Sequence, residues 1–280
     1  TKVKVQDKLN DIILYTDEIT YNKNDDIIIT KNNSELIKNK IIIKANNFNF
    51  NRKLNIIEAK KNVEIDDKLN DYFGEGEKLK YFVNLEKIQT FGTTNAKIES
   101  TYNFNGSNVT LLRNENELYS YKKSRIIDGD LSQYELDEFI YYFKDQFLKG
   151  KNIIFTSDIS ATEDDQEVAK FSDGFFDLKN KSYKASDTSL NIKKNTFDNS
   201  KNDPRIKGVS SESKNGITKI NKAIFTSCGT RNNKCPPWSI KAKEIMHDKN
   251  KKQLIYNQAT LQVYDKPVMY FPKFFHPDPS

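Results

Sequence analysis

The sequence predicts an all-β protein in which short antiparallel strands stack into an elongated architecture. Apolar and polar residues alternate with a period of two in many short segments, as expected of half-buried strands. Polar clusters such as those at 22–26, 51–53 and 105–108 separate these segments and are typical of turns. Aromatic anchors recur through the first half at intervals of about 23 to 31 residues: Tyr21, Phe50, Tyr81 and Phe104.

The first half divides into four hairpin-like units, at about 3–29, 41–65, 79–98 and 102–111. Each contains two or more segments of alternating apolar residues around a polar turn. A repeat of this size predicts that each unit buries its apolar face against its neighbours.

Residues 131–150 depart from this pattern. Ser132 and Glu135 have the spacing of a capping box, and Gly150 suits a helix C-terminus. We therefore expect a short helix over about 133–148, with a pair of strands as the alternative. Five apolar residues follow helical spacing here: Leu136, Phe139, Ile140, Phe143 and Phe147.

The second half again predicts strands. The acidic run at 163–167 is interpreted as a solvated loop, because it lacks the alternating oxygen ligands and glycine turn of a calcium loop. A long polar loop is expected at 195–207. Strands are expected near 153–155, 169–171, 174–178, 182–185, 189–192, 217–225, 240–246, 253–256 and 259–264.

Composition narrows the class of protein. The chain has 280 residues and a formal net charge of +6, spread without a dense basic tract, so no nucleic-acid partner is expected. No stretch of about 18 apolar residues predicts a transmembrane helix. The chain also opens without the charged and apolar regions of a signal peptide.

Catalytic chemistry is not predicted. The chain contains no nucleophile elbow, zinc-protease helix or glycine-rich phosphate loop. The two histidines, His247 and His276, are expected to be structural. With the two cysteines, Cys228 and Cys235, they give weak support for zinc, so we expect no metal, no cofactor and no enzyme activity.

The last fifth of the chain carries motifs that resemble a known family. They are Ala223–Cys228 (AIFTSC), Cys235–Ala242 (CPPWSIKA), Ile245–Asp248 (IMHD), Pro267–Pro272 (PVMYFP) and His276–Ser280 (HPDPS). This set resembles the LptD family of lipopolysaccharide-assembly proteins, and the degenerate strand repeat resembles that of the OstA-like proteins. The resemblance implies an elongated antiparallel β-jellyroll (β-taco) over 1–270, interrupted at about 131–150, and a linker over 271–280 into an outer-membrane β-barrel.

The resemblance also implies a function and partners. The jellyroll of this family receives lipopolysaccharide from an LptA-like periplasmic bridge at its N-terminal edge and passes the acyl chains toward the barrel. An LptE-like lipoprotein and the barrel would lie at the C-terminal end. The implied location is the periplasmic face of the outer membrane, with the signal peptide and the barrel outside this chain. A structural or adhesive β-solenoid without lipid binding is the alternative.

Specific residues follow from this interpretation. Cys228 and Cys235 could pair with each other, or each with a cysteine of the barrel, in an oxidising periplasm. Inward residues of the strands could line a lipid groove or form an ordinary closed core; the candidates for the groove are Ile29, Ile43, Phe48, Phe50, Ile56, Leu79, Tyr81, Phe91, Tyr102 and Phe104.

We expect the prolines near the C-terminus to end the hydrogen-bonded pairing of the last strand. The residues expected at the barrel junction are Trp238, Pro267, Pro272, His276, Pro277 and Pro279.

Overall fold

The computed structural model describes residues 2–193, 203–229 and 236–277. These residues form 24 β-strands and two short 3-10 turns, which confirms the all-β antiparallel class. They contain no helix of the length and apolarity needed to cross a membrane. The chain divides into two compact units. Unit 1 comprises 1–129 and 138–144, and unit 2 comprises 130–137 and 145–280.

Unit 1 contains fifteen of the described strands and the 3-10 turn η1 (Val83–Leu85). The strands are β1 (Val3–Asp7), β2 (Ile12–Thr16), β3 (Glu18–Asn22), β4 (Ile27–Lys31), β5 (Ser34–Lys38), β6 (Ile41–Ala45), β7 (Asn47–Asn51), β8 (Ile56–Asp67), β9 (Tyr72–Phe82), β10 (Lys87–Ile98), β11 (Tyr102–Ser107), β12 (Thr110–Leu112), β13 (Glu117–Ser120), β14 (Ser124–Ile127) and β16 (Glu138–Tyr142).

Unit 2 contains the other nine described strands and the 3-10 turn η2 (Glu163–Asp165). The strands are β15 (Gln133–Leu136), β17 (Phe147–Thr156), β18 (Val168–Asp177), β19 (Ser182–Asn191), β20 (Arg205–Lys214), β21 (Ile217–Thr226), β22 (Trp238–Asp248), β23 (Gln253–Val263) and β24 (Lys266–Pro277).

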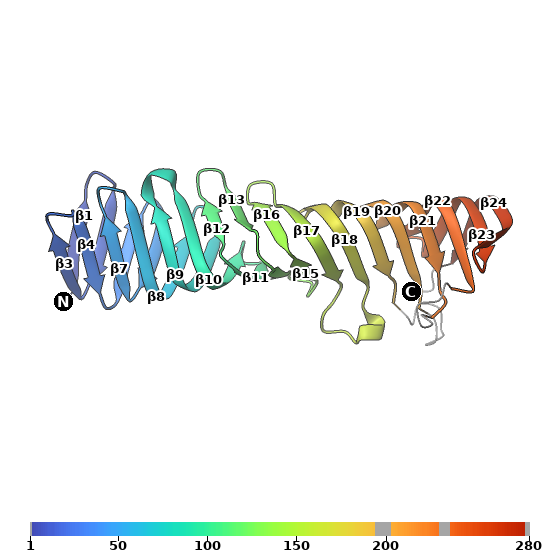
Figure 1. Ribbon diagram of the computed structural model, residues 1–280, viewed down its shortest axis with the longest axis horizontal. Coiled ribbons are helices and arrows are strands. Elements are labelled where there is room, and N and C mark those ends of the chain that lie inside the picture. Colours follow the sequence, from blue (N-terminus) through green and yellow to red (C-terminus); the bar gives the residue numbers. More distant parts are fainter. Residues whose placement is uncertain (1, 194–202, 230–235, 278–280) are drawn as a thin grey trace. The chain divides into compact units, whose positions relative to one another are not determined.

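Unit 1 is an antiparallel meander folded lengthwise into two sheets (Figure 1). Strands β8, β9 and β10 are long enough to contribute one half to each sheet. Sheet A contains β1, β2, β5, β6, β11, β14, and residues 64–67, 72–76 and 94–98. Sheet B contains β3, β4, β7, β12, β13, β16, and residues 56–60, 78–82 and 87–91.

The chain passes between the sheets at bends, which together form a bend line. In β8 the pairing register shifts between Lys60 and Val63, and in β10 between Phe91 and Thr94. Positive φ angles allow these kinks: Asn62 has φ of 52° and Gly92 has φ of 83°. Asparagine and glycine suit such positions because both tolerate left-handed backbone.

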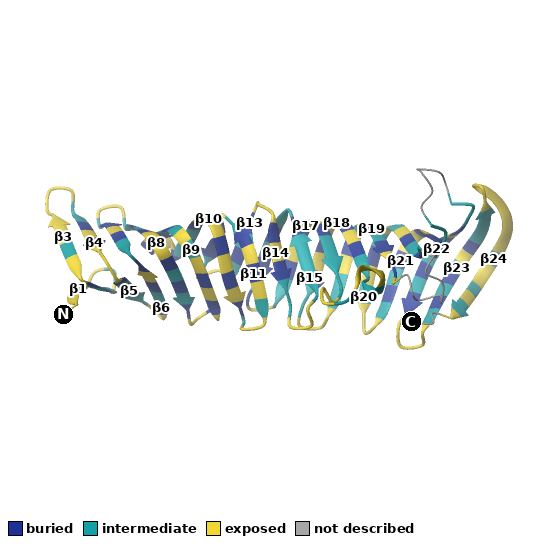
Figure 2. Ribbon diagram, turned by 90° about the horizontal axis from the view of Figure 1, so that it is seen from below, coloured by how far each residue is buried: buried dark blue, intermediate teal, exposed yellow. Residues whose placement is uncertain are grey.

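Unit 2 repeats this design with strands of ten to twelve residues. Strands β17 to β24 form a meander in which each strand pairs with the next. Residues of positive φ interrupt the pairing near the middle of alternate strands: Asn152, Asp187, Lys222 and Gln258. Buried and exposed residues alternate along the strands (Figure 2), so each half-strand has one inward face. Each long strand of unit 2 likewise contributes one half to each sheet. Sheet A of unit 2 contains the half of β17 that follows its bend, together with the half-strands paired beside it, and sheet B contains the other halves.

The helix predicted over 133–148 is absent. Its residues form β15, β16 and the beginning of β17, and β16 pairs with β13 from Phe139 to Tyr142. In β16 and just beyond it, every second residue faces inward: Phe139, Tyr141 and Phe143. Spacing that imitates a helix arises because the chain bends at Asp137 and turns after Tyr142, which shifts the phase of the apolar residues.

Two further expectations about breaks in the ladders were wrong. The turn expected at 105–108 lies mostly inside β11, which continues to Ser107 before the bend at Asn108. The prolines near the C-terminus do not stop pairing, since β24 pairs with β23 on both sides of Pro272. Pro272 lies at the bend of an edge strand, where a missing amide donor is tolerated. The domain boundary predicted at residue 270 falls inside this strand.

Candidate functional site between the two sheets

The inward side chains of unit 1 form one apolar layer between sheets A and B. Phe104 in sheet A packs against Phe139 in sheet B with ring centroids 5.3 Å apart. Tyr102 and Tyr141 face each other across the same layer at 6.4 Å. Burial of this apolar surface is the main favourable contribution to holding the sheets together.

Small residues in this layer lie near the bend line, where they pair with larger buried residues such as Phe48 and Leu79. Thr90 and Thr94 flank the bend in β10, and the Thr94 hydroxyl donates a 2.7 Å hydrogen bond to Oγ1 of Thr90. Ala59 and Ala96 also lie close to the bends and are buried. Tyr81, at the far end of β9, is fully buried. We name the long side that carries the turns the turn edge.

Most of the residues predicted to face a lipid groove do point inward, and all of them belong to unit 1. Three do not: Ile29 and Phe91 are 37% and 38% exposed on the outer face, and Ile56 lies on the outer face next to the inward, buried Ile57. Lys78 Nζ lies 5.2 Å from the centroid of the Phe91 ring, a cation–π contact that suits an outward phenylalanine. Ile56 and Tyr102 are half-buried. The buried inward members are Ile43, Phe48, Phe50, Leu79, Tyr81 and Phe104.

The turn edge differs from the bend line in what holds the sheets together. At the bend line the backbone itself passes from one sheet to the other. At the turn edge of the described residues, each turn joins neighbouring strands of the same sheet. Only side chains bridge the sheets there, so these contacts decide whether the interior can open.

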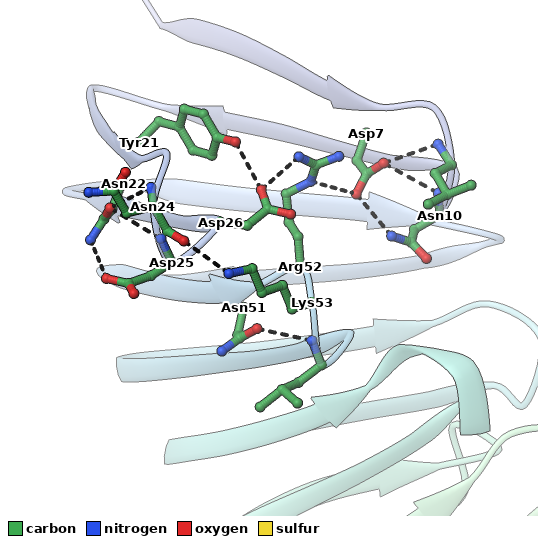
Figure 3. Close-up of polar contacts among 12 residues, drawn as sticks. Asp7, Asn10, Tyr21, Asn22, Asn24, Asp25, Asp26, Asn51, Arg52 and Lys53 are labelled. Carbon is green, nitrogen blue, oxygen red and sulfur yellow. Dashed lines mark hydrogen bonds and ion pairs between the residues drawn. The ribbon is translucent and has the colours of Figure 1, made fainter.

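Arg52 makes the first of these bridges in unit 1 (Figure 3). It follows β7 in sheet B, and its Nε donates a 3.3 Å hydrogen bond to Asp7 at the end of β1 in sheet A. Its Nη1 donates a 2.9 Å hydrogen bond to Asp26, which also accepts one from the Tyr21 hydroxyl at 2.9 Å. Asn10 donates a further 2.9 Å bond to Asp7. The arginine thus connects one turn of sheet A with one turn of sheet B.

Arg113 makes the second bridge and is more deeply buried, with 1% of its surface exposed. It follows β12 in sheet B and donates bonds of 3.0 and 3.1 Å to the two carboxylate oxygens of Asp67 in sheet A. It also donates to the carbonyl of Asn39 at 2.7 Å and to the Glu86 carboxylate. Lys38 of sheet A forms an ion pair with the same Glu86.

Hydrogen bonds and positive charges in these bridges stabilise the ionised carboxylates. Burial alone raises the pKa of Asp7, but hydrogen bonds from Asn10 and Arg52 reverse this and leave the pKa below its usual value. Burial likewise raises the pKa of Glu86, and hydrogen bonds from Lys38 and Tyr81, with the charge of Arg113, lower it overall. Both carboxylates are therefore ionised at neutral pH. Removal of one partner from a buried ion pair costs about 3–5 kcal/mol.

Weaker contacts bridge the turn edge in the described part of unit 2. Lys181 in a sheet B turn lies 2.6 Å from Asp130 in a sheet A turn, and the two side chains are 79% and 67% exposed. Lys249 and Glu167 lie 2.6 Å apart, with 50% and 14% of their side chains exposed. An exposed ion pair such as Lys181–Asp130 contributes about 0–1 kcal/mol.

Arg205, the described arginine of unit 2, does not bridge the sheets. Its Nη1 bonds to Asp203 at 2.8 Å and to the Cys228 carbonyl at 2.6 Å, both in loops on the sheet A side.

Aromatic side chains fill the interior of unit 2 at its C-terminal end. Phe225 packs against Trp238 and Tyr256, with ring centroids 6.0 and 5.9 Å apart. Oη of Tyr256 lies 2.9 Å from Nε2 of His276, and Nδ1 of His276 lies 2.8 Å from the Pro277 carbonyl. Since a carbonyl only accepts, Nδ1 carries the hydrogen. Trp238 and His276, predicted at the barrel junction, thus meet in one cluster.

The last described strand, β24, is an exposed edge. Its residues are mostly solvent-exposed (Figure 2), including Met269 at 54% and Tyr270 at 60%. Pro267, Pro272 and Pro277 lie in this strand, whereas Pro279 lies outside the described residues. Proline is a common device against uncontrolled pairing at a sheet edge.

Cys228 is half-buried, and its thiol is free in the structure. Cys235 lies outside the described residues. The disulfide suggested for these two cysteines therefore stays a prediction.

Comparison with known proteins gives a distant structural likeness. No protein-family model and no curated protein matches the sequence. A solved structure that resembles the fold is LptH, the LptA-homologous periplasmic component of the lipopolysaccharide transport device from Pseudomonas aeruginosa. The identity is 10% and the TM-score 0.30, over 52% of this chain and 86% of that chain. The fold described above rests on the strand pairings of the chain itself.

The described residues contain no group of three or more histidine, cysteine, aspartate or glutamate side chains placed to hold a metal ion. On the outer face of unit 2, a shallow cleft of about 570 Å³ runs over Lys149, Asp173, Phe175 and Glu212, with charges of both signs. The large apolar surface lies inside the fold, between the sheets.

Proposed function

We propose that this chain is a lipopolysaccharide-carrying β-jellyroll that resembles the periplasmic part of LptD. The observation that carries the proposal is the turn edge. Two sheets enclose an apolar layer, the backbone joins them on one long side, and side chains alone hold them on the other. Such a fold can take acyl chains between its sheets without breaking backbone hydrogen bonds. Each CH₂ buried from water contributes about 0.8 kcal/mol, so a lipid with several chains gains substantially.

The sequence motifs of the last fifth of the chain support the same assignment. The set that includes Cys235–Ala242 and Pro267–Pro272 resembles the LptD family. The protein then acts as a carrier and changes no covalent bond. The energy for transport comes from elsewhere in the system.

Partners follow from the two edges. We propose an LptA-like bridge protein at the N-terminal edge, and an LptE-like lipoprotein with a β-barrel at the C-terminal end. The apolar, exposed residues of β24, such as Val268 and Met269, support a docking role for the C-terminal edge. The proposed location is the cell envelope, at the periplasmic face of the outer membrane.

Photo-crosslinking tests the carrier function with matched neighbours. Phe176 is 5% exposed and faces the interior of unit 2, while the adjacent Phe175 is 41% exposed and faces outward. Phe50 and Asn49 form the equivalent pair in unit 1, with Phe50 fully buried. A photo-reactive residue is placed at each position and the protein is irradiated with purified lipopolysaccharide. We expect an adduct at an inward position and none at its outward neighbour.

Two outcomes of the crosslinking experiment would reject the carrier function. Folded protein that forms no adduct at Phe50 or Phe176, or forms it equally at the outward neighbours, rejects the carrier function. The second candidate is then a structural β-solenoid that binds other proteins through its edges. The buried bridge around Arg113, which closes the interior of unit 1, is the observation that favours this candidate.

A further inference from the structure

The bridges at Arg52 and Arg113 are two copies of one arrangement. The five residues 7–11 and 67–71 have the same sequence, Asp-Lys-Leu-Asn-Asp. In both copies the first aspartate accepts a bond from the backbone N–H two residues later, at 3.0 and 3.1 Å. It also accepts one from the asparagine three residues later, at 2.9 and 2.8 Å. An arginine from sheet B completes each copy by binding this aspartate.

The remaining partners repeat as well. Tyr21 donates to Asp26, five residues later, and Tyr81 donates to Glu86 over the same spacing. Each acidic residue then contacts the arginine of its own copy. We name the two copies latch 1 (Asp7, Tyr21, Asp26 and Arg52) and latch 2 (Asp67, Tyr81, Glu86 and Arg113). Three of the four positions recur after 60 residues and the arginine after 61.

Each latch joins the turns of sheet A to those of sheet B, so together they hold unit 1 shut at its turn edge. In latch 2 the arginine and Asp67 are almost completely buried, and the sheets can part only if this buried ion pair and its two hydrogen bonds break. Lysine pairs bridge the described turn edge of unit 2. The Lys181–Asp130 pair is largely solvated and separates at little energetic cost, and the Lys249–Glu167 pair joins a half-exposed lysine to a mostly buried glutamate. The two units therefore differ in how readily their sheets part.

The turns of sheet B in unit 2 also carry the charge that suits an anionic lipid. The two turns at 178–181 and 249–252 contain five exposed lysines: Lys179, Lys181, Lys249, Lys251 and Lys252. They lie at the mouth of the interior that holds Phe176 and Tyr256. Phosphate groups on a lipid whose chains enter this interior would lie beside these lysines. The equivalent turns of unit 1 contain Asp25, Asp26, Glu86 and Glu115 beside their basic residues.

We propose that, when no partner protein is bound, the interior of unit 2 is the part of this protein that admits acyl chains of an anionic lipid, while latches 1 and 2 hold unit 1 shut. This inference rests on the proposed carrier function and assigns its binding site. It places the lipid away from Phe50 and the other groove positions predicted from sequence, all of which lie in unit 1.

The test compares the two units within the whole 280-residue chain. A photo-reactive residue at Phe176 is expected to capture purified lipopolysaccharide, and one at Phe50 is expected to capture none. In the double variant Arg52→Met/Arg113→Met, checked for folding by its β-sheet circular dichroism, Phe50 should gain an adduct. An adduct at Phe50 in the unmodified background as strong as that at Phe176 overturns the inference but leaves the carrier function standing. Adducts at neither position overturn both.

A second measurement tests the lysines without altering the interior. The triple variant Lys179→Gln/Lys251→Gln/Lys252→Gln should lower the adduct yield at Phe176 by roughly tenfold at low salt, since several attractive charges are removed. The matched variant Lys8→Gln/Lys23→Gln/Lys40→Gln removes three exposed lysines from the turns of unit 1 and should change the yield less than twofold, roughly. An equal loss of adduct yield in both variants would mean that the net charge of the protein alone attracts the lipid. That result overturns the placement of the headgroup.

Discussion

The Tyr81 hydroxyl donates a 2.8 Å hydrogen bond to Oε2 of Glu86 inside unit 1. The 3-10 turn between them brings the end of β9 and the start of β10 together around this bond. Burial raises the pKa of Tyr81, and the neighbouring carboxylate raises it further, so the phenol remains protonated and keeps its donor role. The bond fixes the carboxylate where Arg113 and Lys38 both reach it.

Removal of this hydroxyl should weaken latch 2. In Tyr81→Phe the ring still fills its buried place, but Glu86 loses a donor to its charge. We expect unit 1 to lose about 1.5–3 kcal/mol of unfolding free energy. Hydrogen exchange of amides in β8 to β10 measures this locally, because the single tryptophan lies in unit 2 and reports on that unit. The control Tyr121→Phe removes a hydroxyl from a ring that is 65% exposed and should leave these amides unchanged.

Loss of the arginine itself should have a larger effect. Arg113→Met keeps most of the side-chain volume but leaves Asp67 and Glu86 facing each other across a buried space. We expect unit 1 to be destabilised by about 3–5 kcal/mol, measured by denaturant unfolding followed through the same amides.

Two comparisons make this prediction specific. Arg52→Met should cost less, since 32% of the Arg52 side chain is exposed. Lys44→Met removes one partner of a surface pair, whose atoms lie 3.6 Å apart, and should cost under about 1 kcal/mol. If Arg113→Met is no more disruptive than Lys44→Met, latch 2 does not hold the sheets together.

Acid should open the latches. The pKa values of Asp7 and Glu86 lie below their usual values of 3.8 and 4.5, so the folded state favours the ionised forms. The stability that these groups contribute is fully present above the usual values and is lost as the pH falls through the lowered pKa values. We expect unit 1 stability to be flat from about pH 8 to 5 and to fall below about pH 4.

The variant Glu86→Gln isolates one carboxylate in this pH series. It is less stable at neutral pH, but it lacks one group that must be protonated in acid. Its stability should therefore fall less steeply below about pH 4 than that of the unmodified chain. Parallel curves for the two proteins would show that Glu86 does not contribute to the acid response.

The all-β class was predictable from the sequence because each half-strand buries alternate residues. Phe48 and Phe50 face the interior as their spacing indicates. Alternation alone could not reveal where a strand bends. At the bends in β8 and β10 three consecutive residues are exposed, and the inward pattern then resumes in phase, as at Lys60, Lys61 and Asn62 in β8. This polar interruption recurs near the middle of several strands and is the signal that was missed.

The faces of individual residues were harder to predict than the fold. Phe91 is among the residues predicted to line the groove, but the structure leaves its neighbour Thr90 facing inward before the bend at Gly92. The latches were not predicted at all. Arg52 was placed in a turn, and nothing local to it indicates that Asp7, 45 residues earlier, lies across the turn edge. The repeated sequence at 7–11 and 67–71 was the available clue.

Glycine is required at two positions of this fold for different physical reasons, backbone strain at one and steric clash at the other. Gly92 has φ of 83°, and a Cβ added there meets no atom within 4 Å. Gly92→Ala should therefore cost about 1 kcal/mol, through strain alone. A Cβ at Gly106 would lie 2.7 Å from Ser124 Oγ and close to the Phe104 ring, so Gly106→Ala should cost about 1–3 kcal/mol by overpacking.

A second pair of substitutions distinguishes the two causes. Gly92→Asn should restore most of the stability lost in Gly92→Ala, because asparagine tolerates left-handed backbone. Gly106→Ala should instead be relieved by Ser124→Gly, which removes the nearest polar atom. Hydrogen exchange of the amides in β10 and β11 measures both effects. If Ser124→Gly gives no relief, the clash with the Phe104 ring limits this position, and the close approach of β11 to β14 is set by that ring.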